Sequence, residues 1–125
     1  MKDSHQKQIE NFAGFLSKKK NVEAVYLFGS YLSNFGNLSD IDLCIIGNLN
    51  AKEKKEILRE SPELFDVSFF NELPIYIKVR VFGGGKVIYL NERADIEELK
   101  YNTLREYRDF MFFMKNRFTE RFKNA

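Results

Sequence analysis

Cysteine and histidine are almost missing from this chain of 125 residues. With one cysteine, Cys44, and one histidine, His5, it can form neither an internal disulfide nor a zinc site built from these two residue types. Cys44 lies in an apolar run, so we expect a small buried side chain without a role in chemistry. His5 is expected at the surface.

Long apolar segments and an excess of one charge are missing too. No segment approaches the roughly 18 uninterrupted apolar residues that span a bilayer, and the start MKDSHQKQIE has no apolar stretch of the signal-peptide type. Acidic and basic residues are interspersed, and the net charge of +2 lacks the basic surplus of a dedicated duplex-DNA binder. These absences predict a cytoplasmic protein with no membrane segment and no strong nucleic-acid signal.

The spacing of apolar residues predicts helices and strands in alternation. Asn50 and Glu53 offer a reciprocal N-cap, Asn71 and Pro74 begin a further helix, and glycines 83–85 end it. The alternation predicts an α/β (α+β) fold in one domain, with a core at about 4–90, a mixed or parallel four-stranded sheet covered by helices, and a long C-terminal helix. We expect helices at residues 4–20, 50–60, 71–82 and 95–123, and strands at 22–28, 41–46, 64–70 and 86–90.

Two aspartates flank Ile41 where the second strand begins, in the stretch GSYLSNFGNLSDIDL at residues 29–43. Because side chains in a strand alternate between faces, Asp40 and Asp42 point the same way while Ile41 points into the core. Asp66 lies on the polar face of the third strand. If these strands are neighbours, about 4.8 Å apart, three carboxylates share one surface.

Such a cluster needs protons or a cation, because two like charges 4 Å apart repel by about 4 kcal/mol at an effective dielectric constant of 20. Carboxylate oxygens suit Mg²⁺, with Mn²⁺ as the other candidate. Gly29 lets backbone N–H groups approach a phosphate, and Ser30 adds a hydroxyl donor. The combination predicts two-metal phosphoryl transfer from a nucleoside triphosphate, with Asp40 and Asp42 bridging two ions and Asp66 completing one of them and accepting a proton.

Each signal has an ordinary explanation when it is taken singly. A Gly-Ser step is usually a turn, an Asp-x-Asp pair is usually solvated, and a lone aspartate can cap a helix or form a surface ion pair. The order is the informative feature: an apolar strand, Gly-Ser, about ten residues of loop, Asp-x-Asp in a second strand and an aspartate in a third. Three acids on adjacent strands stabilise nothing by themselves, so this order favours a catalytic site.

The stretches LFGSYLSNFGNLSDIDL (27–43) and FDVSFF (65–70) resemble the nucleotidyltransferase superfamily that includes DNA polymerase beta, and within it the minimal nucleotidyltransferases. The resemblance implies two Mg²⁺ ions on Asp40, Asp42 and Asp66. It also implies contacts from Gly29, Ser30 and Ser39 to ATP or another nucleoside triphosphate. Members transfer a nucleoside monophosphate to a hydroxyl, and many small members are antitoxins that adenylylate a tyrosine of a helical HEPN-type toxin.

The loop departs from the family pattern at two positions. The family often has an arginine directly after Gly-Ser and a glycine three residues beyond it, where this chain has Tyr31 and Asn34. Asn34 can adopt the left-handed conformation that a glycine supplies. The triphosphate contact of the missing arginine could come from Lys78 or Arg80 instead.

Alternatives remain open for the partner and for the activity. Residues 110–114, FMFFM, cover more than one turn of a helix, so this helix either fills a groove of its own domain or packs on another chain, a toxin or a second copy. The activity is either AMP transfer to a partner protein or, as the alternative, binding by the same fold with little or no catalysis. A small-molecule acceptor is less favoured, because so short a chain leaves little room for a substrate-binding domain.

Overall fold

The computed structural model describes residues 2–29 and 41–123. The expectations for Ser30, Tyr31, Asn34, Ser39 and Asp40 therefore lie outside the described residues. Along the chain the elements are α1 (Lys2–Ser17), β1 (Val22–Phe28), β2 (Ile41–Gly47), α2 (Ala51–Glu60), β3 (Phe65–Phe69), the 3₁₀ turn η3 (Phe70–Glu72), α3 (Ile75–Gly84), β4 (Lys86–Leu90) and α4 (Ile96–Lys123).

The four strands form one mixed sheet in the order β3-β2-β1-β4. β1 lies antiparallel to both of its neighbours, whereas β2 and β3 run parallel. A parallel pair needs a crossover connection, and α2 supplies it between β2 and β3. The predicted mixed four-stranded sheet with covering helices is confirmed.

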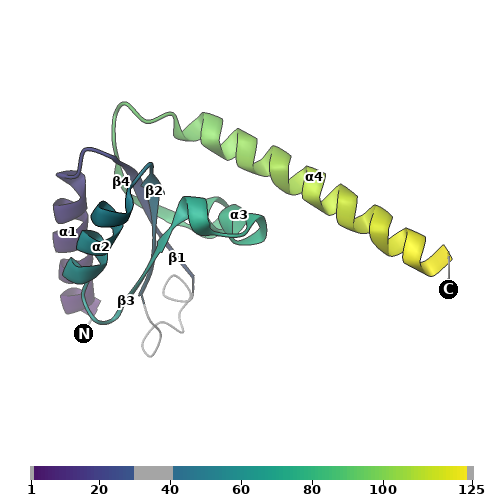
Figure 1. Cartoon of the computed structure of the whole chain (residues 1–125). Helices are drawn as coiled ribbons and strands as arrows, with labels where there is room; N and C mark the ends of the chain where they lie inside the picture. Colours follow the sequence, from purple (N-terminus) through teal and green to yellow (C-terminus); the bar gives the residue numbers. More distant parts are fainter. Residues whose placement is uncertain (1, 30–40, 124–125) are drawn as a thin grey trace.

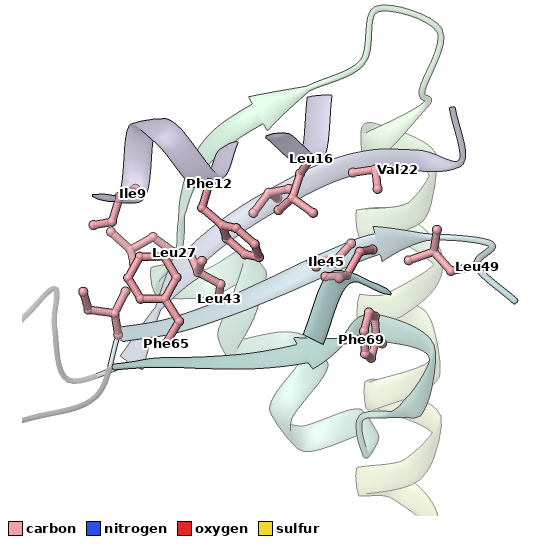
Figure 2. Packing of buried hydrophobic residues seen from close by; sticks show 13 residues of the cluster. Ile9, Phe12, Leu16, Val22, Leu27, Leu43, Ile45, Leu49, Phe65 and Phe69 are labelled. Atoms are coloured by element: carbon pink, nitrogen blue, oxygen red, sulfur yellow. The ribbon is translucent and has the colours of Figure 1, made fainter. Parts of the chain in front are cut away.

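One face of the sheet carries the larger apolar core, beneath α1 and α2 (Figure 1). Figure 2 shows Ile9, Phe12 and Leu16 of α1 directed at the strands. Phe12 meets Phe65 of β3 edge to face, with ring centroids 5.6 Å apart. The strand residues of this cluster alternate along each strand, as the period-2 pattern predicts: Val25, Leu27, Ile41, Leu43, Ile45, Phe65 and Phe69.

The opposite face of the sheet packs against η3, α3 and the start of α4. Ala24, Tyr26, Cys44 and Ile46 line it from β1 and β2, and Phe70, Val81 and Ile96 cover it. Burial raises the pKa of the Cys44 thiol to about 12. Cys44 is buried, as expected.

The local signals at the helix ends were partly right. Asn50 caps α2 as predicted: its side-chain oxygen accepts from the N–H of Glu53 at 2.8 Å, and the Glu53 carboxylate accepts from the N–H of Asn50 at 3.1 Å. The prediction that Asn71 begins the third helix is wrong, because Asn71 lies in η3 and its Nδ2 donates to the carbonyl of Gly47 at 3.4 Å. α3 begins after Pro74 and includes glycines 83 and 84, so the helix runs two residues beyond its expected end.

The last helix leaves the domain (Figure 1). Its first turns pack on the second core through Ile96 and Leu99, and Thr103 is also buried. From residue 104 to residue 120 every position except Tyr107 is exposed. The alternative in which residues 110–114 fill a groove of their own domain is therefore wrong. None of the helices in the described part of the chain is long and apolar enough to cross a membrane.

Candidate functional site

Two of the three predicted acidic residues lie opposite each other on neighbouring strands. In the parallel β2–β3 ladder, Asp42 is the register partner of Asp66. Because paired residues of parallel strands point to the same face, both carboxylates lie on the side of the sheet that Cys44 and Ile46 occupy. Asp42 is half-buried and Asp66 is exposed. The expected adjacency of their strands is confirmed, whereas their role as ligands stays a prediction.

The end of β1 lies directly beside Asp42 of β2. Phe28, the last residue of β1, pairs with Asp42, and Gly29 follows with φ +83°. A Cβ at Gly29 would lie 2.2 Å from Oδ2 of Asp42, so the Asp42 side chain or the backbone would have to shift. Position 29 therefore favours glycine for two reasons: the backbone there is left-handed, and it approaches the Asp42 carboxylate closely. The role of Gly29 in approaching a phosphate stays a prediction.

A hollow of about 590 Å³ opens beside these residues. This volume lies within the range of about 300–1,000 Å³ that is typical of small-molecule sites. Asp42 and the end of β1 form one wall, and α3 forms the other. The glycines at the end of α3 carry no side chains to fill the space. The lining residues are Phe28, Gly29, Asp42, Ile77, Val79, Arg80, Gly83 and Gly84.

Arg80 is the one cation among these lining residues. Of the two basic residues considered for the missing arginine contact, Lys78 points elsewhere: its Nζ lies 5.2 Å from the centroid of the Phe70 ring. Arg80 is exposed and carries a planar guanidinium that suits phosphate oxygens. The structure thus favours Arg80 over Lys78 at this site.

Sequence reasoning missed the contribution of α3 to the wall. Glycines 83 and 84 were interpreted only as the end of a helix, and Ile77 and Val79 were given no role. The available signal was the pair of glycines itself, because a helix end without side chains leaves space for a ligand beside it.

The acidic residues in the described ranges are compatible with a hard cation but do not complete its shell. Among residues 2–29 and 41–123, no group of three histidine, cysteine, aspartate or glutamate side chains could hold a metal ion. Asp42 and Asp66 supply two carboxylates on one face, and the third predicted carboxylate, Asp40, lies outside these ranges. Oxygen donors of this kind fit Mg²⁺ or Mn²⁺ better than Zn²⁺.

Solved structures share this fold over most of the chain. A chain from the crystal structure of a toxin–antitoxin complex with AMP-PNP matches with a TM-score of 0.68 and 20% identity, covering 89% of this chain and 96% of that chain. A chain from the complex of a tri-AMPylated Shewanella oneidensis HEPN toxin with its MNT antitoxin matches with a TM-score of 0.67 and 18% identity, covering 89% of this chain and 93% of the other. At these identities the likeness establishes the fold.

Sequence similarity identifies the family as well as the fold. A candidate protein adenylyltransferase of Methanocaldococcus jannaschii is 35% identical over 89 residues, which cover 70% of this chain and 71% of the relative. The family model described as polymerase beta, nucleotidyltransferase matches residues 10–94, a span that includes Asp42, Asp66 and the hollow beside them. The chain therefore belongs to the polymerase beta nucleotidyltransferase family.

Proposed function

We propose that this protein is a Mg²⁺-dependent nucleotidyltransferase that transfers AMP from ATP to a hydroxyl of a partner protein. The observation that carries the proposal is the register pairing of Asp42 with Asp66 beside a hollow that Gly29 and Arg80 line. A relative named for protein adenylyl transfer and a matching fold in a complex with AMP-PNP support this substrate class.

Asp40, Asp42 and Asp66 are the residues that would hold the metal. Mg²⁺, when bound, supplies positive charge that offsets the charge of the triphosphate and of the departing pyrophosphate. The carboxylates fit this use because their chemistry is that of hard oxygen donors, and because two of them are register partners on one face.

The chain's own residues do the remaining work. Gly29 admits the backbone to the triphosphate, Ser30 and Ser39 donate hydroxyl hydrogen bonds to it, and the Arg80 guanidinium binds its oxygens. Asp66, which is exposed in the edge strand β3, accepts the proton of the attacking hydroxyl. The acceptor oxygen forms a bond to the α-phosphorus, the bond from that phosphorus to the bridging oxygen breaks, and pyrophosphate leaves with the electron pair.

We further propose that the acceptor is a HEPN-type toxin and that this protein is its antitoxin. The fold is shared with chains of toxin–antitoxin complexes, one of which contains an AMPylated HEPN toxin. The exposed apolar residues of α4 are consistent with a protein partner. A tyrosine hydroxyl is the acceptor group that the family resemblance favours.

The catalytic proposal is tested by replacing Asp66. In the presence of Mg²⁺, ATP labelled at the α-phosphate should label a HEPN-type protein encoded beside this one, and Asp66→Asn should reduce the labelling rate by about 10²-fold or more, as expected for loss of a metal ligand and base. Glu63→Gln is the matched control, because it removes one exposed carboxylate near the start of β3 but outside the cluster. Equal labelling by the wild type and Asp66→Asn would contradict the assignment.

A second candidate function is neutralisation of the partner by binding alone, and Tyr31 at the usual arginine position favours it. The double variant Asp40→Asn/Asp42→Asn separates the two candidates. If cells that express the toxin grow equally well with the variant and with the wild type, binding is sufficient. If the variant fails to protect them although it still binds the toxin, transfer is required.

A further inference from the structure

A regular apolar stripe runs along the part of α4 that leaves the domain. Its members recur at alternating spacings of three and four residues, and we call them the α4 stripe: Leu104, Tyr107, Met111, Met114 and Phe118. The exposed fractions are 57% for Leu104, 49% for Met111, 48% for Met114 and 65% for Phe118, and Tyr107 is half-buried. This spacing is that of the a and d positions of a heptad, which pack against a second helix.

The α4 stripe continues the face by which α4 packs on its own domain. Leu99 packs on the second core and Thr103 is buried, and each further step of four residues leads along the same side of the helix to Tyr107 and Met111. Figure 1 shows that this helix extends well beyond α3. The apolar face of α4 is thus longer than the domain that covers its beginning, and at about 1.5 Å per residue the stripe adds roughly 21 Å.

Charges are sorted around the stripe. By helical geometry, Arg108 and Lys115 lie along one edge and Arg117 along the other. The guanidinium carbon of Arg117 also lies 5.4 Å from the centroid of the Phe113 ring, outside the stripe. Of the acidic residues in the same segment, Asp109 lies on the face opposite the stripe, and Glu106 and Glu120 lie between that face and the edge of Arg117. Phe110 lies on the same edge as Arg117. The positions along the two edges of the stripe therefore hold basic or uncharged residues, and none of them is acidic.

This sorting disfavours a second copy of the chain as the occupant. In an antiparallel pair, equivalent edges meet, so Arg108 and Lys115 of one copy would face the same cations of the other. In a parallel pair, each edge meets the other edge, and neither supplies an acidic residue at these positions.

We propose that the α4 stripe docks an amphipathic helix of a different protein, one that carries acidic residues beside its own apolar seam, opposite Arg108, Lys115 and Arg117. The apolar seams would bury each other, and opposite charges at the edges would select the partner. The inference rests on the proposed function in one respect, namely that the docked protein is the one that receives AMP. The docking itself needs neither nucleotide nor metal.

Two designed peptides serve as probes. Both are labelled three-heptad helices with isoleucine at a and leucine at d; one has glutamate at every e and g position, and the other has lysine there. Binding to the full-length protein is followed by fluorescence anisotropy. We expect the glutamate peptide to bind at least tenfold more tightly than the lysine peptide, and we expect this preference to shrink at high salt because the edge charges are solvent-exposed.

Matched variants locate the binding surface. Met111→Glu/Met114→Glu should abolish binding of the glutamate peptide, whereas Phe112→Ser, at a 68% exposed position outside the stripe, should leave it within about twofold of wild type, as expected for a surface substitution. All these positions are exposed, and far-UV circular dichroism checks that the helix is retained. These variants lie away from the candidate site, so a failure of docking and a failure of AMP transfer give separate results.

Four results would overturn the proposal. The first is equal or tighter binding of the lysine peptide, and the second is no binding of either peptide. The third is a dimer of the chain that Met111→Glu/Met114→Glu dissociates in sedimentation experiments. The fourth is binding to vesicles with 30% phosphatidylserine that exceeds binding to the glutamate peptide. The third result would identify a second copy as the occupant, and the fourth would identify a membrane surface.

Discussion

Gly29 and Asp42 are the residues whose placement is most constrained at the candidate site. The φ of +83° is open to glycine, and an added Cβ would collide with a carboxylate oxygen 2.2 Å away. The contact joins the end of β1 to the acidic residue of β2, so any side chain at position 29 displaces the group that the proposed metal site needs. A single substitution can therefore test stability and ligand binding together.

Gly29→Ala should lower the free energy of unfolding by at least about 1–2 kcal/mol, the cost of a left-handed backbone for an L-residue. It should also weaken binding of Mg·AMP-PNP, because Asp42 must move. Urea unfolding and isothermal titration calorimetry measure the two effects. Gly14→Ala is the control: Gly14 lies in α1 with open space around it, so alanine should stabilise the helix by about 0.5–1 kcal/mol. Unchanged stability of Gly29→Ala would contradict the left-handed backbone.

Arg80 and Lys78 make a second comparison between single residues. Arg80→Ala should raise the Kd of Mg·AMP-PNP by about tenfold, which corresponds to about 1.4 kcal/mol for an exposed contact between a guanidinium and a phosphate. Lys78→Ala should change this Kd by less than about twofold, because Lys78 packs over Phe70 and does not line the hollow. Calorimetric titration of the two variants decides between them, and a larger effect at Lys78 would refute the assignment of Arg80.

At the level of single elements, α2 is the crossover that makes β2 and β3 parallel neighbours. Its start is held by a capping box between Asn50 and Glu53. The Glu53 carboxylate also accepts from Nδ2 of Asn21 at 2.9 Å, and Lys19 forms an ion pair with Glu56. The segment between α1 and β1 is thereby tied to the first turns of α2. The cap contributes both to the helix and to the position of the crossover.

Asn50→Ala should lower the free energy of unfolding by about 1 kcal/mol, the usual effect of losing an N-cap side chain. Asn48→Ala, at an exposed asparagine just before the cap, should change it by less than about 0.5 kcal/mol. Chemical denaturation at pH 7 measures both variants. A loss of equal size at both positions would mean that the cap contributes nothing specific.

For the molecule as a whole, α4 contains the boundary between the packed domain and a helical segment that projects from it. Its first turns close the second core, whereas residues 108–120 are exposed. A helical segment without tertiary contacts gains little stability from propensity alone, so a docked partner would stabilise this part. The domain and the projecting helix are therefore expected to respond independently to mutation.

A chain that ends after Tyr107 should unfold at nearly the same urea concentration as the full-length protein, with a difference in free energy below about 1 kcal/mol, because exposed segments contribute little to global stability. The helical signal at 222 nm should fall in proportion to the residues removed. A large drop in the urea midpoint would show that the end of α4 packs on the domain in solution. If the further inference is right, the shortened chain also loses the glutamate peptide.

Rules that involve only residues close together in the sequence predicted much of the fold. The strands 22–28 and 86–90 were predicted with the bounds that the structure has, and the alternation in 65–69 placed Asp66 on the face opposite Phe65. The cap at Asn50 needed only residues three positions apart. Asn71 failed as a cap because Leu73, the residue before Pro74, is extended, so the helix begins only after the proline.

The sequence alone determined the period of each strand, the cap of α2 and the family motif, because these depend on neighbouring residues and on backbone geometry. Only the tertiary structure decided that Asp42 and Asp66 are register partners, that Arg80 and not Lys78 lines the hollow, and that α4 runs past its own domain. These features depend on which elements pack together over long stretches of chain. Side-chain spacing within a single element does not contain that information.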